Sequence, residues 1–182
     1  MKYSIYIYEG DLSVPELREN LMADAVMAYC DTHDIGCDAL TIERAEKGKP
    51  YIYGTEDPVY CNVSHTGNMW IAIVGPEECG IDLQQIADCK YEQIARRYFS
   101  PQEQEYIRDY GMTGFFRLWV RREAFGKFTG EGFYGTKPPF VDATGRLIDL
   151  VEDGFLKDLP IADDIICTYC TGREEDDIEF FG

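Results

Sequence analysis

The sequence predicts an α+β fold, because its strand-like and helix-like segments come in blocks. Residues 2–9 (KYSIYIYE) alternate apolar and polar side chains, as a half-buried strand does, and a helical pattern follows them. Strand-like pieces then fill residues 39–84, helical patterns fill residues 90–128, and strand-like pieces return up to residue 171. A parallel α/β sheet would instead alternate strand and helix along the whole chain.

The first block contains one predicted helix among several predicted strands. Pro15 begins the helix, where its missing N–H is not needed, and Leu17, Leu21, Ala25 and Ala28 form the predicted apolar stripe. Glycine and asparagine supply the turn chemistry between the strands. The strands expected after the helix are two pieces within 39–54 around a Lys-Gly-Lys-Pro turn, a hairpin within 59–75 around Thr66-Gly67-Asn68, and a short strand at 79–84.

The second block predicts three helices, and a final block predicts three strands. Ser100-Pro101-Gln102-Glu103 has the pattern of a capping box with proline at the first helical position. The last helix ends near Phe128, because the glycine-rich residues 129–132 cannot continue it. The expected helices are 90–99, one from 101 and one over about 114–128, and the expected strands are 139–150, 154–160 and 163–171.

Length and composition indicate a globular chain. Its 182 residues, 45% of them apolar, suffice for one sizeable core or two small fused ones. The N-terminal strand soon meets Glu9 and Asp11, so it lacks the unbroken apolar stretch of a signal peptide. No segment reaches the roughly 20 apolar residues of a membrane span. We therefore expect a cytoplasmic protein without a membrane partner.

The seven cysteines indicate free thiols in a reducing compartment, because their number is odd and the chain is too long to need disulfides. Only Cys167 and Cys170 form a C-x-x-C pair, and His33 and His65 are the two histidines. We expect this pair to be buried thiols of a strand. Metal binding or redox chemistry is the alternative.

The charge is unevenly distributed along the chain. With 34 acidic and 17 basic residues, the formal charge of −17 argues against general binding to nucleic acid. Residues 90–127 nevertheless hold eight bases against five acids, a net charge of +3. A basic region on an acidic protein indicates a specific anionic partner. A solvated helical surface is the alternative.

Two segments carry acids that could bind a metal. In the strand GIDLQ, Asp82 and Gln84 share one face and offer two oxygens, which suits Mg²⁺. An ordinary surface strand has the same pattern. In the helix, Trp119, Glu123 and Lys127 are spaced i, i+4, i+8 and share one stripe. They could be an exposed ion pair beside a packed tryptophan, or a functional carboxylate beside a cation that holds phosphate.

Two turns carry candidate ligand-binding side chains. Ser64 and His65 are neighbours in a strand and point in opposite directions, so they are not a nucleophile and its base. One of them could bind a ligand, or the histidine could be structural. Lys47 and Lys49 flank a glycine, which is either a phosphate clamp or an ordinary surface turn.

The order of these motifs resembles the 4′-phosphopantetheinyl transferases. The chain is similar to their larger, single-chain type, which activates peptide and polyketide synthetases such as surfactin synthetase. A GKP turn at 48–50 precedes NVSHTG at 62–67, GIDLQ follows about fifteen residues on, and W-x-x-x-E-A-x-x-K about forty residues after that. The resemblance covers roughly residues 15–170.

The resemblance implies a pseudo-dimer of two similar α+β halves, residues 1–79 and 80–182, with the active site in the cleft between them. It implies transfer of phosphopantetheine from coenzyme A to a serine of an acyl or peptidyl carrier protein, with Mg²⁺ required. Because one chain holds both halves, a monomer suffices. The basic residues from Lys90 to Arg122 would dock an acidic carrier, and the arginines beside Glu123 would balance substrate and carrier charge.

The resemblance also implies roles for individual side chains. Asp82 and Glu123 match the metal-binding acids, and Glu123 could also take the proton of the carrier serine. Lys127 matches a lysine that contacts the pyrophosphate, so these three residues form the expected catalytic set. The positions that match those holding the phosphates of the nucleotide are Ser64, His65, Lys49 and, on the first helix, Arg18.

Three features depart from the family pattern. Gln84 stands where relatives often carry a third acidic metal ligand, so we expect water there or weaker metal binding. Arg122 replaces the usual lysine and keeps its charge but not its shape. The N-terminus lacks basic residues that help to hold the 3′-phosphate in longer relatives. We expect an active enzyme. The alternatives are an idle relative that binds coenzyme A or a carrier protein without transfer, and an unrelated acidic interaction domain.

Overall fold

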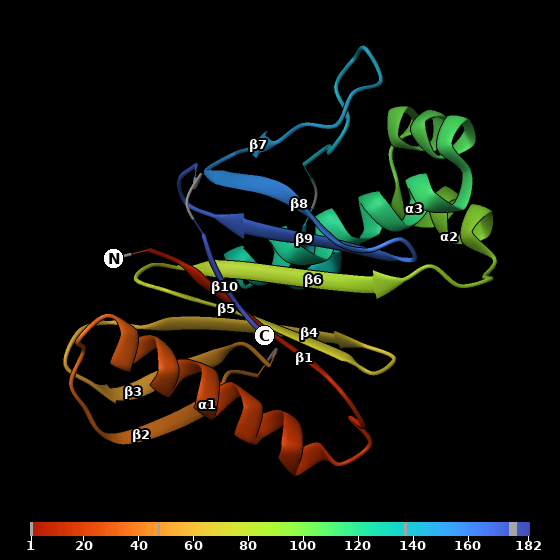
Figure 1. The fold of residues 1–182 in the computed structure, drawn as a ribbon. Helices are drawn as coiled ribbons and strands as arrows, with labels where there is room; N and C mark the ends of the chain where they lie inside the picture. Colours follow the sequence, from red (N-terminus) through yellow and green to blue (C-terminus); the bar gives the residue numbers. More distant parts are fainter. Residues whose placement is uncertain (1, 47, 137, 175–177) are drawn as a thin grey trace.

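This computed structural model describes residues 2–46, 48–136, 138–174 and 178–182, and within them the strands form three sheets (Figure 1). The bounds are β1 Ser4–Glu9, β2 Cys37–Arg44, β3 Pro50–Thr55, β4 Tyr60–Thr66, β5 Met69–Gly75, β6 Cys79–Gln85, β7 Leu150–Val151, β8 Gly154–Ala162, β9 Ile165–Thr171 and β10 Glu179–Phe181. One sheet has the order β10-β1-β5-β4, a second the order β6-β9-β8-β7, and β2 and β3 form a separate hairpin. The helices lie in blocks outside these sheets, so the α+β prediction is confirmed.

The helices of the described chain are α1 Pro15–Thr32, α2 Tyr91–Tyr98, α3 Pro101–Thr129 and α4 Gly132–Gly135. In Figure 1, α1 and the β2–β3 hairpin cover the outer face of one central sheet, and α3 covers the outer face of the other. Among the described residues, no helix combines the length and the apolar character needed to cross a bilayer.

Helix α1 begins at Pro15 as predicted, but its buried face differs from the predicted stripe. Met22, Ala25, Val26 and Tyr29 are buried, whereas Leu17, Leu21 and Ala28 are only half-buried. The helix packs on β5, and this contact determines which face is turned inward. The spacing of the apolar residues therefore predicted the helix correctly, but it predicted its buried face only in part.

Helix α3 joins two helices that the sequence predicted separately. It is broken at Gly111, whose φ of 62° and ψ of −144° lie outside the helical region and are accessible mainly to glycine. The predicted capping box is confirmed: the Ser100 N–H donates to Glu103 Oε2 at 2.8 Å, and the Glu103 N–H donates to Ser100 Oγ at 3.3 Å. The helix ends at Gly130, which has a left-handed φ of 77°.

The strand predicted over 139–150 is wrong. This segment contains an isolated bridge between Val141 and Leu147, and its last residue begins the two-residue strand β7. Asp142 Oδ1 accepts hydrogen bonds from the N–H groups of Thr144 and Arg146, at 2.8 and 3.0 Å. These bonds close a tight turn in the middle of the apolar pattern, so an extended strand cannot form.

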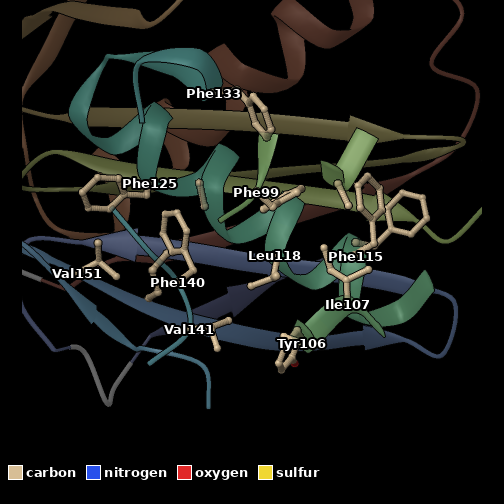
Figure 2. Close-up of a cluster of buried hydrophobic side chains, with 14 of the residues drawn as sticks. Phe99, Tyr106, Ile107, Phe115, Leu118, Phe125, Phe133, Phe140, Val141 and Val151 are labelled. Carbon is tan, nitrogen blue, oxygen red and sulfur yellow. The ribbon is translucent and has the colours of Figure 1, made fainter. Parts of the chain in front are cut away.

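Among the described residues, three hydrophobic cores stack one on another. One lies between α1 and its sheet and includes Met22, Tyr29 and Trp70. A second lies between the two central sheets and joins residues such as Ile5 and Ile71 to residues of the other sheet. The third, shown in Figure 2, gathers the phenylalanines of α3 and its neighbours: Phe99, Phe115, Phe125, Phe133 and Phe140. The middle core therefore holds the two sheets together.

The two central sheets share a core of three strands in the same order, β1-β5-β4 and β6-β9-β8. In each core the middle strand comes last in the sequence and pairs antiparallel with both of its neighbours. A helix follows the first strand on each occasion. Near the C-terminus, β10 crosses to the first sheet and pairs parallel with β1.

The strands β4 and β6 belong to different sheets but are linked by a ladder of side chains. The backbone N–H groups of Ile81, Leu83 and Gln85 donate to side-chain oxygens of β4, with donor–acceptor distances of 3.2, 3.5 and 3.3 Å. The acceptors are Asn62 Oδ1, Ser64 Oγ and Thr66 Oγ1. Alternation along a strand places these three side chains on one face of β4. We call this contact the seam.

The thiol prediction is confirmed for the C-x-x-C pair. Cys167 and Cys170 are both buried, and all seven cysteines are free. Cys167 lies in the core between the sheets and Cys170 in the core under α3. Since the two side chains point to opposite faces of β9, they cannot chelate one metal ion.

Candidate active site at the seam

Asp82 lies at the centre of the seam. Its side chain is 5% exposed, and Oδ1 accepts a hydrogen bond from Ser64 Oγ at 2.7 Å. Lys127 Nζ donates to the same oxygen at 2.8 Å. The structure thus brings together three of the predicted site residues, from β4, β6 and α3.

The Lys127 ammonium of α3 has three acceptors, which lie on two strands. Besides Asp82, it donates to the carbonyl oxygen of Ile81 at 2.8 Å and to that of Val63 at 3.3 Å. An ammonium has three protons, so these acceptors use all of them. Lys127 therefore links α3 to both strands of the seam.

Glu123 lies one helical turn before Lys127 and is half-buried. Its pKa is raised above the ordinary value of 4.5, first by burial and then by the negative charge of Asp82, while Lys127 acts in the opposite direction. The two carboxylates are therefore close enough for each charge to oppose the other. A divalent cation between them would relieve this repulsion.

The second oxygen of Asp82 is the clearest indication that the site could hold a cation. Asp82 Oδ2 is buried and has no hydrogen-bond partner, although buried polar atoms almost always have one. Gln84 lies two residues further along β6, on the same face, and is half-buried. Carboxylate and amide oxygens are the ligands that Mg²⁺ prefers, so these residues fit that ion. No group of three or more His, Cys, Asp or Glu side chains forms a metal cluster within the described ranges.

His65 points away from Asp82 and meets Arg18 of α1. The distance from Arg18 Nη1 to His65 Nε2 is 2.7 Å. Because arginine can only donate, Nε2 must accept, and the imidazole is neutral. Burial lowers the pKa of His65, and the charges of Arg18 and Lys127 lower it further. Arg18 and His65, which are 47 residues apart, together form a cationic position that an anion could share.

Lys49 reaches across the seam from the turn before β3. Its Nζ lies 2.6 Å from Glu78 Oε2 and donates to the Phe128 carbonyl oxygen at 3.1 Å. With Arg44 and Lys127 it lines a cavity of about 110 Å³ between β4 and the end of α3. The other lysine of the predicted clamp, Lys47, lies outside the described residues.

A comparison with protein families finds a match in this chain. Residues 78–154 match the family described as the 4′-phosphopantetheinyl transferase superfamily. This part of the chain is similar to that superfamily. The matched residues include Asp82, Gln84, Glu123 and Lys127, whereas Lys49, Ser64 and His65 precede them.

Curated phosphopantetheinyl transferases are similar to between about half and two thirds of the chain. The putative 4′-phosphopantetheinyl transferase slr0495 of Synechocystis sp. is 35% identical over 98 residues, which are 49% of this chain and 39% of that protein. HetI of Nostoc sp. is 33% identical over 94 residues, 47% of this chain and 40% of that protein. Psf-1 of Bacillus pumilus is 27% identical over 127 residues, 66% of this chain and 54% of that protein. The chain thus matches about two fifths to a half of the length of these phosphopantetheinyl transferases.

Two arginines beside Glu123 are internal, which corrects the prediction that they face substrate or carrier. Arg121 is buried and binds Asp158 and Asp149 at 3.0 and 2.9 Å. Arg122 is buried too, donates to the Tyr98 carbonyl oxygen at 2.6 Å and lies 3.5 Å from Glu103. Both therefore neutralise neighbouring acids and cannot belong to a docking surface.

Arg122 also explains one departure from the pattern of phosphopantetheinyl transferases. Its guanidinium group lies 4.8 Å from the centre of the Phe99 ring and 5.4 Å from that of Phe133. A flat cation can stack on aromatic rings, whereas the ammonium of lysine cannot. The shape of arginine is therefore used here for packing.

Sequence reasoning missed Asn62 and Thr66, which form the seam together with Ser64. The available signal was the alternation of polar residues in NVSHT, within a hairpin that is otherwise apolar. Polar side chains at every second position of a buried strand need partners. The missing information was that another strand lies beside them.

Proposed function

We propose that this protein transfers 4′-phosphopantetheine from coenzyme A to a serine of an acyl or peptidyl carrier protein, in a reaction that depends on Mg²⁺. The observation that carries the proposal is the meeting of Asp82, Glu123 and Lys127 at the seam, where one buried carboxylate oxygen has no hydrogen-bond partner. The superfamily match over residues 78–154 supports this reaction class.

The proposal includes a pseudo-dimer of two similar halves, residues 1–79 and 80–182, with the active site between them. The shared strand order of the two central sheets supports it. In this division β10 belongs to the second half by sequence but extends the sheet of the first. One chain supplies both walls of the site, so we propose that it acts as a monomer. The free thiols suit a reducing compartment such as the cytoplasm.

Asp82, Glu123 and the Gln84 amide oxygen would hold the metal ion. When bound, Mg²⁺ would place positive charge beside the pyrophosphate of coenzyme A and so stabilise the charge that develops on the leaving nucleotide. Asp82 has Oδ2 available for this, because Oδ1 is already bonded to Ser64 and Lys127.

Lys127 and Glu123 would act on the reacting groups. Of the three bonds of the Lys127 ammonium, that to Val63 is the longest at 3.3 Å, so this proton is the most easily redirected to a phosphate oxygen. Glu123 would accept the proton of the attacking serine hydroxyl. Its raised pKa makes it a stronger base than an ordinary glutamate.

The phosphates of the nucleotide would bind to the cations of the first half. Arg18 and His65 form one cationic position, and Lys49 lines the cavity at the seam. An anion would be stabilised at both by charge-assisted hydrogen bonds. Ser64 was also predicted to contact the nucleotide, but its hydroxyl is bonded to Asp82.

The carrier protein would dock on the exposed bases of α2 and the start of α3. Arg121 and Arg122 are buried and do not belong to this surface. The exposed bases of the region are Lys90, Arg96, Arg97 and Arg108. Arg96 and Arg108 line a groove of about 360 Å³ between the two helices. Positive charge there would attract an acidic carrier and increase the rate of association.

A transfer assay tests the proposal. The protein is mixed with coenzyme A, Mg²⁺ and a panel of apo carrier proteins, and the carriers are weighed by mass spectrometry. We expect a gain of one phosphopantetheine on at least one carrier, and a loss of this gain in Glu123→Gln. Glu43→Gln, the same change at an exposed position of β2, should remain active. Binding of coenzyme A or carrier without any mass gain would instead indicate an idle relative.

A further inference from the structure

Ser64 has a contact that a ligand of the nucleotide would not need. Its side chain is turned into the seam, the residue is 8% exposed, and Oγ lies 2.7 Å from Asp82 Oδ1. The neighbouring His65 points in the opposite direction, toward Arg18. The side chain of Ser64 therefore faces the carboxylate at the centre of the site.

The direction of the Ser64 hydroxyl follows from counting protons. An ionised carboxylate has no proton to donate, so the bond to Asp82 must use the single proton of the hydroxyl. The Leu83 N–H approaches the same Oγ at 3.5 Å and supplies a long contact to a lone pair. With its proton committed to Asp82, Ser64 has none to donate to a phosphate.

This contact constrains how the Asp82 carboxylate can turn. Oδ1 is held by Ser64 and Lys127 at once, whereas Oδ2 is buried without a partner. Turning the carboxylate by half a rotation would give Ser64 and Lys127 the other oxygen, whereas a quarter turn would move Oδ1 away from both donors. Ser64 thus keeps one oxygen occupied and the other presented to the interior of the site.

We infer that Ser64 is a positioning residue that orients Asp82 for metal binding and is not a ligand of the nucleotide phosphates. The inference rests on the proposed function, since it concerns the same site. Hydrogen bonds from neighbouring groups commonly determine how well a ligating side chain holds its metal, and their loss reduces affinity about 10–100-fold. Ser64 would provide that bond for Asp82 from the opposite half of the protein.

Metal binding without turnover tests the inference. The affinity for Mn²⁺, a spectroscopic substitute for Mg²⁺, is measured by electron paramagnetic resonance without coenzyme A or carrier. We expect Ser64→Ala to weaken binding about tenfold or more. Thr66→Ala is the matched control, because Thr66 accepts from the seam in the same way but does not touch Asp82. It should leave the affinity within about twofold, and an equal loss in both variants would overturn the inference.

An isosteric pair covers the possibility that Ser64→Ala does not fold. Ser64→Thr keeps the hydroxyl, whereas Ser64→Val has the same shape without it. We expect metal affinity near that of the wild type in the threonine variant and a loss of about tenfold or more in the valine variant. Equal affinities in the two variants would contradict a role for the hydroxyl.

Nucleotide binding without metal separates the two roles of Ser64. In the presence of a chelator, Ser64→Ala should bind coenzyme A within about twofold of the wild type, and the ratio should be the same for dephospho-coenzyme A. Weaker binding of coenzyme A alone would make Ser64 a phosphate ligand and overturn the inference. If the wild type binds Mn²⁺ tightly, the Ser64 variants bind it more weakly, and no carrier is modified, the proposed function is contradicted and the inference stays supported.

Discussion

The Lys127 ammonium lies between acceptors from two strands, β4 and β6, and this residue shows how the seam compensates its buried charges. Asp82 supplies the negative charge, and two backbone carbonyl groups supply the remaining acceptors. Arg121 and Arg122 are compensated in the same way, by neighbouring acids. A buried charge without such partners would be strongly destabilising. The cations gathered around Glu123 are therefore mainly structural, apart from Lys127.

The pair of Arg18 and His65 gives a prediction for the titration of one histidine. Arg18→Met should raise the pKa of His65 toward its ordinary value of 6.5, because a positive charge that opposes protonation is removed. Burial, the larger cause of the lowered pKa, remains, so the return should be partial. The measurement is an NMR titration, with His33 as internal reference. An unchanged His65 titration would show that the contact is not formed in solution.

Glu123 should destabilise the metal-free protein. A carboxyl group whose pKa is higher in the folded than in the unfolded state favours folding below its unfolded pKa, and this contribution is lost as the pH rises through the folded pKa. At pH 7 the ionised Glu123 therefore opposes folding, and Glu123→Gln should raise the melting temperature in the presence of a chelator.

The gain from Glu123→Gln should disappear near pH 4, where the wild-type glutamate is protonated. Thermal unfolding of both proteins at the two pH values measures the effect. A lower melting temperature of the variant at pH 7 would mean that the attraction to Lys127 exceeds burial and the repulsion by Asp82. Any gain in stability should accompany the loss of transfer activity, as is common where catalytic groups are strained.

Contact between β6 and α3 depends on a glycine. A Cβ atom built on Gly80 would lie 2.1 Å from the Ala124 carbonyl oxygen and 2.6 Å from the Phe128 nitrogen, which are both backbone atoms. Side chains can move aside, but this helix backbone is held by its own hydrogen bonds. Gly80 therefore allows α3 to approach the strand that carries Asp82, and so brings Glu123 and Lys127 near it.

Gly80→Ala should be strongly destabilising for this reason. Overpacking in a well-packed core costs about 1–3 kcal/mol and sometimes more. Gly172→Ala is the matched control, since its nearest atom would lie at an ordinary 3.8 Å. Urea unfolding of the two variants measures the difference. If Gly80→Ala is as stable as Gly172→Ala, α3 does not approach β6 this closely in solution.

The whole molecule has two outer cores joined by a middle one, and this arrangement predicts cooperative unfolding. The middle core contains residues of both sheets, and β10 returns from the end of the chain to the first sheet. Separating the two central sheets would expose this apolar surface. It would also leave the N–H groups of the seam without their side-chain partners. Each such group costs about 1–3 kcal/mol.

The two tryptophans report on this cooperativity, because Trp70 lies in the core beside α1 and Trp119 packs against the core beneath α3. Trp70→Phe and Trp119→Phe each leave one fluorescent reporter. Each variant is unfolded in urea and followed by both fluorescence and circular dichroism. We expect the two curves of each variant to coincide, because the fluorescence of either tryptophan should change together with the loss of secondary structure. A reporter that changes before the secondary structure is lost would indicate halves that unfold separately.

Most elements could be predicted from the sequence because their signals are local. The capping box at Ser100, the hairpin around Gly67 and the helix that begins at Pro15 each depend on a few neighbouring residues. The strand over 139–150 failed because the bonds of Asp142 override the apolar pattern, and the break in α3 depends on the conformation of one glycine.

By itself the sequence determined the α+β order and the residue types that could do chemistry, since periodicity, capping and motif spacing are properties of adjacent residues. Only the tertiary structure decided the partners of those residues. The Ser64 hydroxyl reaches Asp82 across 18 residues and the Lys127 ammonium reaches it across 45, while Arg121 and Arg122 turn inward. The physical reason is that burial and hydrogen-bond geometry at the seam depend on how two sheets and a helix pack together. No pattern of adjacent residues specifies this packing.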